Sequence, residues 1–232
     1  MTLHTDRISF LQASGHIIRN GTMFCFYIGK YLVIFYENRY PPPLNIDTFN
    51  GDCYVSLVAF TMQKIRPRFF PSIEFISDFN EINLRTYINN NGKRGVYFLN
   101  IEAGKSLSVL MAKLLSGLPY EKANIRRTDD LYTSTNRKKK FVLDTEFTVK
   151  DPLKNKTGLD KWLTERYCLF LHVNNRFYRY DIHHKEWEIN SLDIRRLKLY
   201  YEIGGLHLSE REPDLTHYSS GVKVIAWPRK VL

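Results

Sequence analysis

A row of polar side chains in segment 79–88 combines residue types that could do chemistry. From residue 81 onward polar and apolar residues alternate, and the polar ones are Glu81, Asn83, Arg85 and Tyr87. Successive side chains of a β-strand point to opposite faces, so these four would share one face. Alternation is also typical of a strand with one face in solvent, so the pattern leaves open both a pocket and a wet surface.

If the row lines a pocket, its charged groups need partners and could act on a ligand. Glu81 and Arg85 are four residues apart, so they could satisfy each other directly or through Asn83. Glu81 could then serve as a general base, and the guanidinium of Arg85 could bind a carboxylate or an enolate.

Three other stretches contain candidate site residues, and each also has a plain structural interpretation. Pro119 and Tyr120 lie in "SGLPYEK", which can be a simple turn after a helix. Glu165 and Arg166 in "TERYCLF" can form an ordinary surface ion pair. Trp187 in "DIHHKEWEI" can fill the core.

Several motifs that carry a known mechanism are absent from the sequence. The chain contains no phosphate-binding glycine loop, GxSxG elbow, HExxH pair or calcium-binding loop. Its three cysteines include no CxxC, and His183 and His184 would point to opposite faces of a strand. We therefore expect no cofactor and no metal.

The composition fits one globular domain over residues 1–232. The chain is 44% hydrophobic and 14% aromatic, which favours a substantial core and a strand-rich fold. Its net charge of +10 and stretches such as "RPRFF" and "NRKKK" indicate attraction to anions. No RNP-like or helix-turn-helix pattern accompanies them, so nucleic acid is not the expected partner.

The apolar run 23–36 is the sequence's one candidate for a membrane span. It is about 14 residues long and contains Lys30, whereas a spanning helix needs about 20 residues. It also lacks the small-residue cleavage site of a signal peptide. We expect a cytoplasmic protein with reduced cysteines and no membrane partner.

Turn signals outline a large, mostly antiparallel sheet. Asn91–Gly92 predicts a tight hairpin between strands 81–88 and 95–102, and Asn174–Asn175 predicts a second hairpin. Nine or ten short strands are expected in all. Such a set of strands closes into a barrel or packs on itself.

The remaining segments divide into one clear helix and two weaker elements. Leucines at helical spacing, followed by Gly117 and Pro119, predict a central helix near 106–116. Residues 159–167 suggest a short helix or turn, and residues 208–221 form a polar segment before the last strand.

The order of several motifs resembles the YqjF-like family of bacterial proteins of unknown function, in the acetoacetate decarboxylase-like superfamily. The resemblance extends from Leu44 to Trp187 and rests on "LNIDTFNGDCYVSLVAFTM", "RPR", "FNEINLRTYI", "GVYFLNIEA", "LSGLPY", "TERYCLF" and "IHHKEW". It implies a mainly β (β-rich α+β) fold, a barrel- or cone-like antiparallel sheet around a largely apolar cavity. Residues 1–43 depart from the family pattern and look shortened.

The resemblance also bears on the decarboxylase chemistry of the superfamily, which uses a lysine made nucleophilic by desolvation and a second cation. In acetoacetate decarboxylase a lysine pair follows a Gly-aromatic-Pro turn. Gly117-Leu118-Pro119 resembles this turn, but Tyr120 and Glu121 stand in the place of the lysines. The resemblance therefore implies that Schiff-base decarboxylation is lost while the cavity is kept.

Three functions follow as expectations. The first is a β-barrel that binds a small, partly apolar organic molecule. The second is an enzyme acting on a carbonyl or keto-acid compound, with Glu81 as base, and the third is an anion- or nucleic-acid-binding module. The expected ligand-pocket residues are Glu81, Asn83, Arg85, Tyr87, Pro119, Tyr120, Glu165, Arg166 and Trp187.

Overall fold

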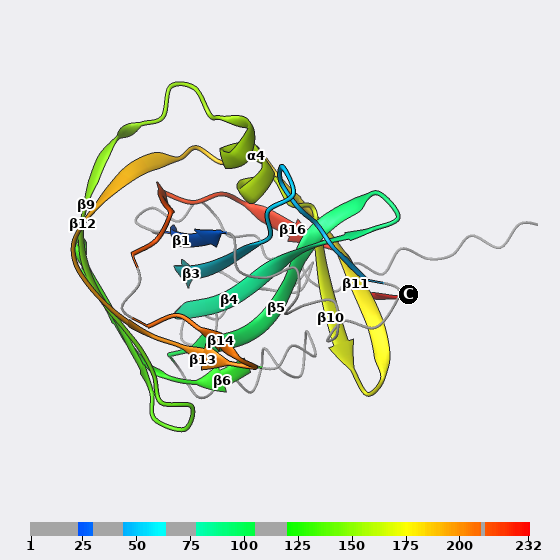
Figure 1. Cartoon of the computed structure of the whole chain (residues 1–232), viewed down its shortest axis with the longest axis horizontal. Helices are drawn as coiled ribbons and strands as arrows, with labels where there is room; N and C mark the ends of the chain where they lie inside the picture. The colour runs from blue at the N-terminus through cyan, green and yellow to red at the C-terminus, as the bar shows by residue number, and fades with distance from the viewer. Residues whose placement is uncertain (1–22, 30–43, 64–77, 105–119, 210–211) are drawn as a thin grey trace, which may run out of the picture.

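The computed structural model describes residues 23–29, 44–63, 78–104, 120–209 and 212–232 (Figure 1). Its first strands are β1 (Met23–Gly29), β2 (Asn45–Ile46), β3 (Tyr54–Met62), β4 (Phe79–Asn90), β5 (Lys93–Ala103), β6 (Tyr120–Lys122), β7 (Asn124–Arg127), β8 (Leu131–Asn136) and β9 (Phe141–Pro152). Helix α4 (Gly158–Thr164) is followed by β10 (Cys168–Val173), β11 (Arg176–His184), β12 (Asn190–Tyr200), β13 (Glu202–Ile203), β14 (Leu206–His207), β15 (Leu215–Ser219), β16 (Val224–Ala226) and β17 (Lys230–Val231). The predicted helix near 106–116 lies outside the described residues.

One large sheet dominates the fold, in the order β16-β11-β10-β5-β4-β3-β1-β15-β12-β9-β8-β7. All of its described strand pairs are antiparallel except β5 with β6 and β5 with β10. In Figure 1 the strands β9 and β12 curve round one side, while β3, β4 and β5 cross the middle. The fold is therefore mainly β and mostly antiparallel, as the sequence predicted.

The curled sheet returns towards its own middle through side-chain contacts. Arg127 Nη1 on β7 donates to Thr61 Oγ1 on β3 at 2.6 Å, and the Tyr132 hydroxyl on β8 donates to the Glu81 carbonyl at 3.0 Å. Within the described ranges no strand pairing completes the circle between β7 and β4. The shape is thus cone-like rather than a barrel closed by a continuous ladder.

The two predicted hairpins are confirmed, and the backbone conformation of their turn residues explains why they form. Strands β4 and β5 pair up to Asn90 and Lys93, and the intervening Asn91 and Gly92 have φ of 50° and 77°. Asn174 and Asn175, between β10 and β11, have φ of 50° and 56°. Asn and Gly tolerate this left-handed conformation, which matches the twist of the flanking strands.

Both faces of β4 are covered by apolar clusters. Ile82 and Leu84 belong to a core that also contains Tyr132, Phe141 and Tyr201. Phe79 and Tyr87, on the opposite face, belong to a second core. The other buried members of this second core are Val58, Val96, Ile101, Ala103, Tyr120, Trp162, Leu163, Leu169, Leu171 and Tyr180. Glu81, Asn83 and Tyr87 of the polar row are therefore buried, while Arg85 is only partly buried.

Helix α4 packs on this second core. Thr157 accepts a hydrogen bond from the Asp160 backbone, and the Asp160 side chain accepts one from the Thr157 backbone, which forms a capping box. The indole ring of Trp162 lies 4.7 Å from the Tyr87 ring, centroid to centroid. The segment that the sequence assigned to a short helix or turn is thus a helix.

The polar segment 208–221 contains a strand that the sequence analysis missed. Strand β15 lies between β1 and β12 in the sheet, and His217 and Ser219 on it are buried. Its polar side chains find partners inside the fold: Thr216 donates to the Leu192 carbonyl at 3.1 Å, and His217 binds Asp160. No apolar alternation marked it because hydrogen bonds replace apolar contacts there.

Gly95 allows β5 and β10 to approach each other closely. An added Cβ would lie 2.3 Å from the Cys168 carbonyl oxygen, which is backbone and cannot turn away. We expect Gly95→Ala to lower the free energy of unfolding by about 3 kcal/mol, because overpacking forces the strands apart. Urea melts measure this loss.

Gly104→Ala is the matched control for this substitution. The nearest atom to an added Cβ there is the Ile125 Cβ at 3.6 Å, an ordinary contact. Its effect should stay below about 1 kcal/mol. Equal losses in the two variants would show that β5 and β10 are not held this closely.

Candidate functional site

Glu81 and Tyr120 form a buried hydrogen-bonded pair on the second core. Tyr120 on β6 aligns with Ile101 on β5, which in turn aligns with Asn83 on β4. This register brings the Tyr120 hydroxyl to Glu81 Oε2, to which it donates at 2.9 Å. Glu81 is 2% exposed and Tyr120 is 7% exposed, so both polar groups are removed from water.

Burial shifts the proton affinity of both members of the pair. Desolvation raises the pKa of Glu81 from 4.5 to about 7, although hydrogen bonds from Tyr120 and Asn83 partly oppose this shift. The pKa of Tyr120 is raised well above 10.0 by burial and by the charge of Glu81. Near neutral pH the site therefore contains a neutral phenol beside a carboxyl group that can hold or release its proton.

The other members of the row occupy different surroundings along β4. Asn83 Nδ2 donates to Glu81 Oε1 at 3.4 Å, so Asn83 is a hydrogen-bonding partner of Glu81. Tyr87 is fully buried, and its hydroxyl hydrogen-bonds to Ser56 Oγ. Arg85 is only partly buried. A direct ion pair between Glu81 and Arg85 remains a prediction.

Arg166 lies at the Tyr87 end of the row. Its Nη1 donates to Asp47 Oδ2 at 2.5 Å, and its Nε donates to the Trp162 carbonyl at 2.6 Å. The guanidinium carbon is 4.8 Å from the Tyr87 ring centroid and 4.0 Å from that of Trp162. Arg166 is therefore a buried cation that contacts two neighbouring aromatic rings and is not part of a surface ion pair.

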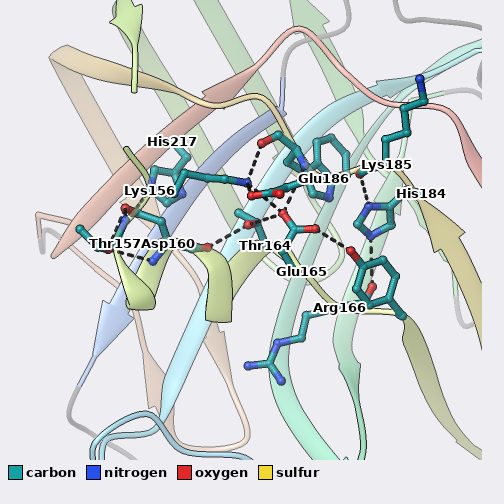
Figure 2. Close-up of polar contacts among 12 residues, drawn as sticks. Lys156, Thr157, Asp160, Thr164, Glu165, Arg166, His184, Lys185, Glu186 and His217 are labelled. Atoms are coloured by element: carbon teal, nitrogen blue, oxygen red, sulfur yellow. Dashed lines mark hydrogen bonds and ion pairs between the residues drawn. The ribbon is translucent and has the colours of Figure 1, made fainter. Parts of the chain in front are cut away.

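Glu165 points the opposite way, into a separate network (Figure 2). Its Oε1 accepts from Lys156 Nζ and from the Trp187 backbone, both at 3.2 Å. Lys156 also contacts Glu186 at 2.7 Å. The Trp187 side chain is partly buried against the second core. Glu165 and Trp187 are thus in contact, and the contact is a hydrogen bond from the Trp187 backbone N–H to the Glu165 carboxylate.

The structure therefore divides seven of the nine predicted site residues into three clusters, and the partly buried Arg85 belongs to none of them. Glu81, Asn83 and Tyr120 form the first cluster, Tyr87 and Arg166 the second, and Glu165 and Trp187 the third. Pro119 lies outside the described residues. No described group of three or more His, Cys, Asp or Glu side chains is arranged to hold a metal ion.

Sequence reasoning missed a buried histidine–aspartate pair beside α4. His217 Nε2 lies 2.7 Å from Asp160 Oδ1, and Asp160 Oδ2 accepts from the Thr157 backbone and hydroxyl (Figure 2). It also missed Asp47, the partner of Arg166. The capping box "TGLD" was a readable signal for Asp160, but nothing local indicated its contact with His217.

The fold resembles acetoacetate decarboxylase-like enzymes. An acetoacetate decarboxylase from Legionella pneumophila superposes with a TM-score of 0.62 over 100% of this chain and 90% of that chain, at 10% identity. An acetoacetate decarboxylase-like enzyme from Sphingomonas wittichii gives 0.58 over 91% and 90%, at 13% identity. The enduracididine biosynthesis enzyme MppR, complexed with pyruvate, gives 0.60 over 99% and 91%, at 10% identity. At these identities the likeness shows the fold.

Sequence comparison then defines the family. The model of DUF2071, described as an uncharacterized conserved protein, matches residues 36–223. The uncharacterized protein YqjF of Bacillus subtilis is 32% identical over 196 residues, which cover 81% of each chain. The chain therefore belongs to this YqjF-like family, as its motifs indicated. No helix in the described residues is long and apolar enough to cross a membrane.

Proposed function

We propose that the protein binds a small, partly apolar organic molecule whose carbonyl or carboxyl oxygen meets the Glu81–Tyr120 pair. The buried hydrogen bond between these two side chains carries the proposal. On the neighbouring strands Val58 and Phe60 align with Asn83 and Glu81 from one side, and Ile101 and Ala103 from the other. A polar strip between apolar strands suits a ligand with one polar group.

The proposed ligand is bound without a Schiff base. Tyr120 and Glu121 occupy the positions at which the resemblance places the decarboxylase lysines, and a phenol cannot form an imine. Lys122 is exposed, whereas an activated amine needs desolvation. In this proposal residues 1–232 form one domain that acts in the cytoplasm. The pyruvate complex of MppR, a protein of similar fold, makes small oxo acids a sensible first panel.

An enzyme acting on a carbonyl compound is a second candidate, and the pKa of Glu81 favours it. A general base works best when its pKa lies near the working pH, and that of Glu81 is raised to about 7. Glu81 would take a proton next to the carbonyl group, and the Tyr120 hydroxyl would stabilise the resulting oxyanion. Turnover of a bound compound, lost in Glu81→Gln, would distinguish this candidate from simple binding.

Tyr120→Phe tests the proposal by removing a single hydroxyl. Calorimetric titration with pyruvate, 2-oxobutanoate and acetoacetate should detect binding to the wild-type protein. The variant should bind about tenfold more weakly, because a hydrogen bond to a charged or polarised oxygen is worth about 1.5 kcal/mol or more.

Tyr200→Phe is the matched control, since the exposed Tyr200 hydroxyl contacts only Glu202 among the described residues, at 3.2 Å. This variant should bind like the wild-type protein. Binding that Tyr120→Phe leaves unchanged would rule out the pair as the site, and a panel without any binder would count against the proposed ligand class.

A further inference from the structure

Arg166 is a buried cation with unused hydrogen-bonding capacity. Its side chain is 4% exposed and contacts Asp47 through a single nitrogen, Nη1. Carboxylates commonly bind arginine through two parallel hydrogen bonds, so this contact uses less than the guanidinium offers. Figure 2 shows the guanidinium pointing away from the network around Glu165 and Lys156. The Arg166 guanidinium therefore takes no part in that network.

Among the described residues, the charges in contact around Arg166 leave an excess of one positive unit. Asp47 is the carboxylate in contact with Arg166, and it also lies 3.7 Å from Arg94 Nε. Two guanidinium groups thus share one negative charge. The Arg94 side chain is 59% exposed, so the Asp47 side of this cluster borders solvent. An additional anion would balance the charge there.

Two buried nitrogen donors in this cluster have no acceptor among the described residues. They are Arg166 Nη2 and Trp162 Nε1, on two side chains that stack on each other with the guanidinium carbon 4.0 Å from the ring centroid. Buried polar groups are usually paired, and leaving one unpaired costs about 1 to 3 kcal/mol. Because both groups are donors, the missing partner is an acceptor.

We propose that Arg166 and the Trp162 indole N–H bind the carboxylate of a small molecule, which enters past Arg94. A planar carboxylate offers two oxygens, one for Arg166 Nη2 and one for the indole nitrogen. The site is separate from Glu81, because Tyr87 is six residues farther along β4, about 20 Å at about 3.3 Å per residue. The inference therefore does not depend on the proposed function.

Benzoate and its neutral analogue benzamide test the site in the intact protein. The chain has three tryptophans, so the indole N–H signals are few in a nitrogen–proton correlation spectrum, and Trp162→Phe assigns the one from Trp162. Benzoate should move this signal in a saturable way, whereas benzamide should not. The same titration with inorganic phosphate distinguishes carboxylate from general oxyanion binding. A signal that no carboxylate moves, or that benzamide or phosphate moves equally, overturns the proposal.

Variants assign the effect to Arg166. Arg166→Gln should weaken benzoate binding about tenfold or more, whereas Arg196→Gln, on an exposed arginine paired with Asp144 and Glu146, should not. Asp47→Asn removes the competing carboxylate and should tighten binding about tenfold, which keeps the test decisive if Arg166→Gln does not fold. Benzoate affinity that is the same in Arg166→Gln, or weaker in Asp47→Asn, contradicts the proposal.

Discussion

Glu81→Gln is expected to remove a loss of stability that the wild-type protein suffers as the pH rises from about 4.5 to 8. The pKa of Glu81 is about 7 in the folded protein, against 4.5 for the exposed group. Between these values the folded chain holds a proton that the unfolded chain has released. The carboxyl group therefore contributes stability below pH 4.5, and this contribution is lost as the pH rises through 7.

The expected size of this effect is about 3 kcal/mol, since each pKa unit corresponds to about 1.4 kcal/mol. Glutamine has nearly the same shape and does not ionise, and its amide oxygen can still accept from Tyr120. The free energy of unfolding of Glu81→Gln, relative to the wild-type protein, should therefore increase by about 3 kcal/mol between pH 4.5 and 8. Urea melts at four pH values in this range measure the difference.

Glu146→Gln is the matched control, because the Glu146 side chain is 38% exposed and pairs with Arg196 on the surface. Its difference from the wild-type protein should change by no more than about 1 kcal/mol over the same range. A similar pH dependence in the two variants would mean that the Glu81 carboxyl is hydrated, and the Glu81–Tyr120 site would then lose its physical basis.

Asp160→Ala is expected to destabilise the protein by about 2 to 5 kcal/mol, from a lost hydrogen bond to a charged group (about 1.5 to 3 kcal/mol) and a lost helix cap (about 0.5 to 2 kcal/mol). The Asp160 side chain accepts from Thr157 at one oxygen and meets His217 at the other. An ionised carboxylate only accepts, so His217 Nε2 carries the hydrogen. The substitution removes the capping box of α4 and the acceptor of a fully buried imidazole together.

Denaturant melts at pH 7.5 measure this loss, with Asp193→Ala as the control. The Asp193 side chain is exposed and pairs with the exposed Lys150 at 3.3 Å, so its removal should cost no more than about 1 kcal/mol. Equal losses would show that α4 is not anchored through Asp160. His217 adds a pH signature. Burial lowers the pKa of His217 below 6.5, so the contribution of His217 to the free energy of unfolding should fall as the pH drops below that value.

Some features of the protein were determined by local sequence alone. Asn91–Gly92 and Asn174–Asn175 specify their hairpins because these residues tolerate positive φ in two-residue turns. The expectation that Tyr120 and Glu121 stand where the resembling decarboxylase has its lysine pair also comes from the sequence, because it depends only on residue type after the Gly-Leu-Pro turn. Motif order likewise indicated the YqjF-like family and its mainly β fold.

Burial of the polar row was decided by the tertiary structure. The alternation at 81–88 is the same whether one face is wet or covered, and only the packing of a second core on that face distinguishes the two. Strand β15 was missed for a related reason. Its polar residues are satisfied by distant partners, which leave no apolar pattern behind.

The pairings that define the candidate sites also came only from the fold. Tyr120 lies 39 residues from Glu81, Asp160 lies 57 residues from His217, and Asp47 lies 119 residues from Arg166. Residue type predicted that buried charges at these positions would need partners, but several acceptors and donors along the chain could have served. The strand register and the docking of α4 selected one partner for each, because a hydrogen bond forms only within about 3 Å and with its donor aimed at its acceptor.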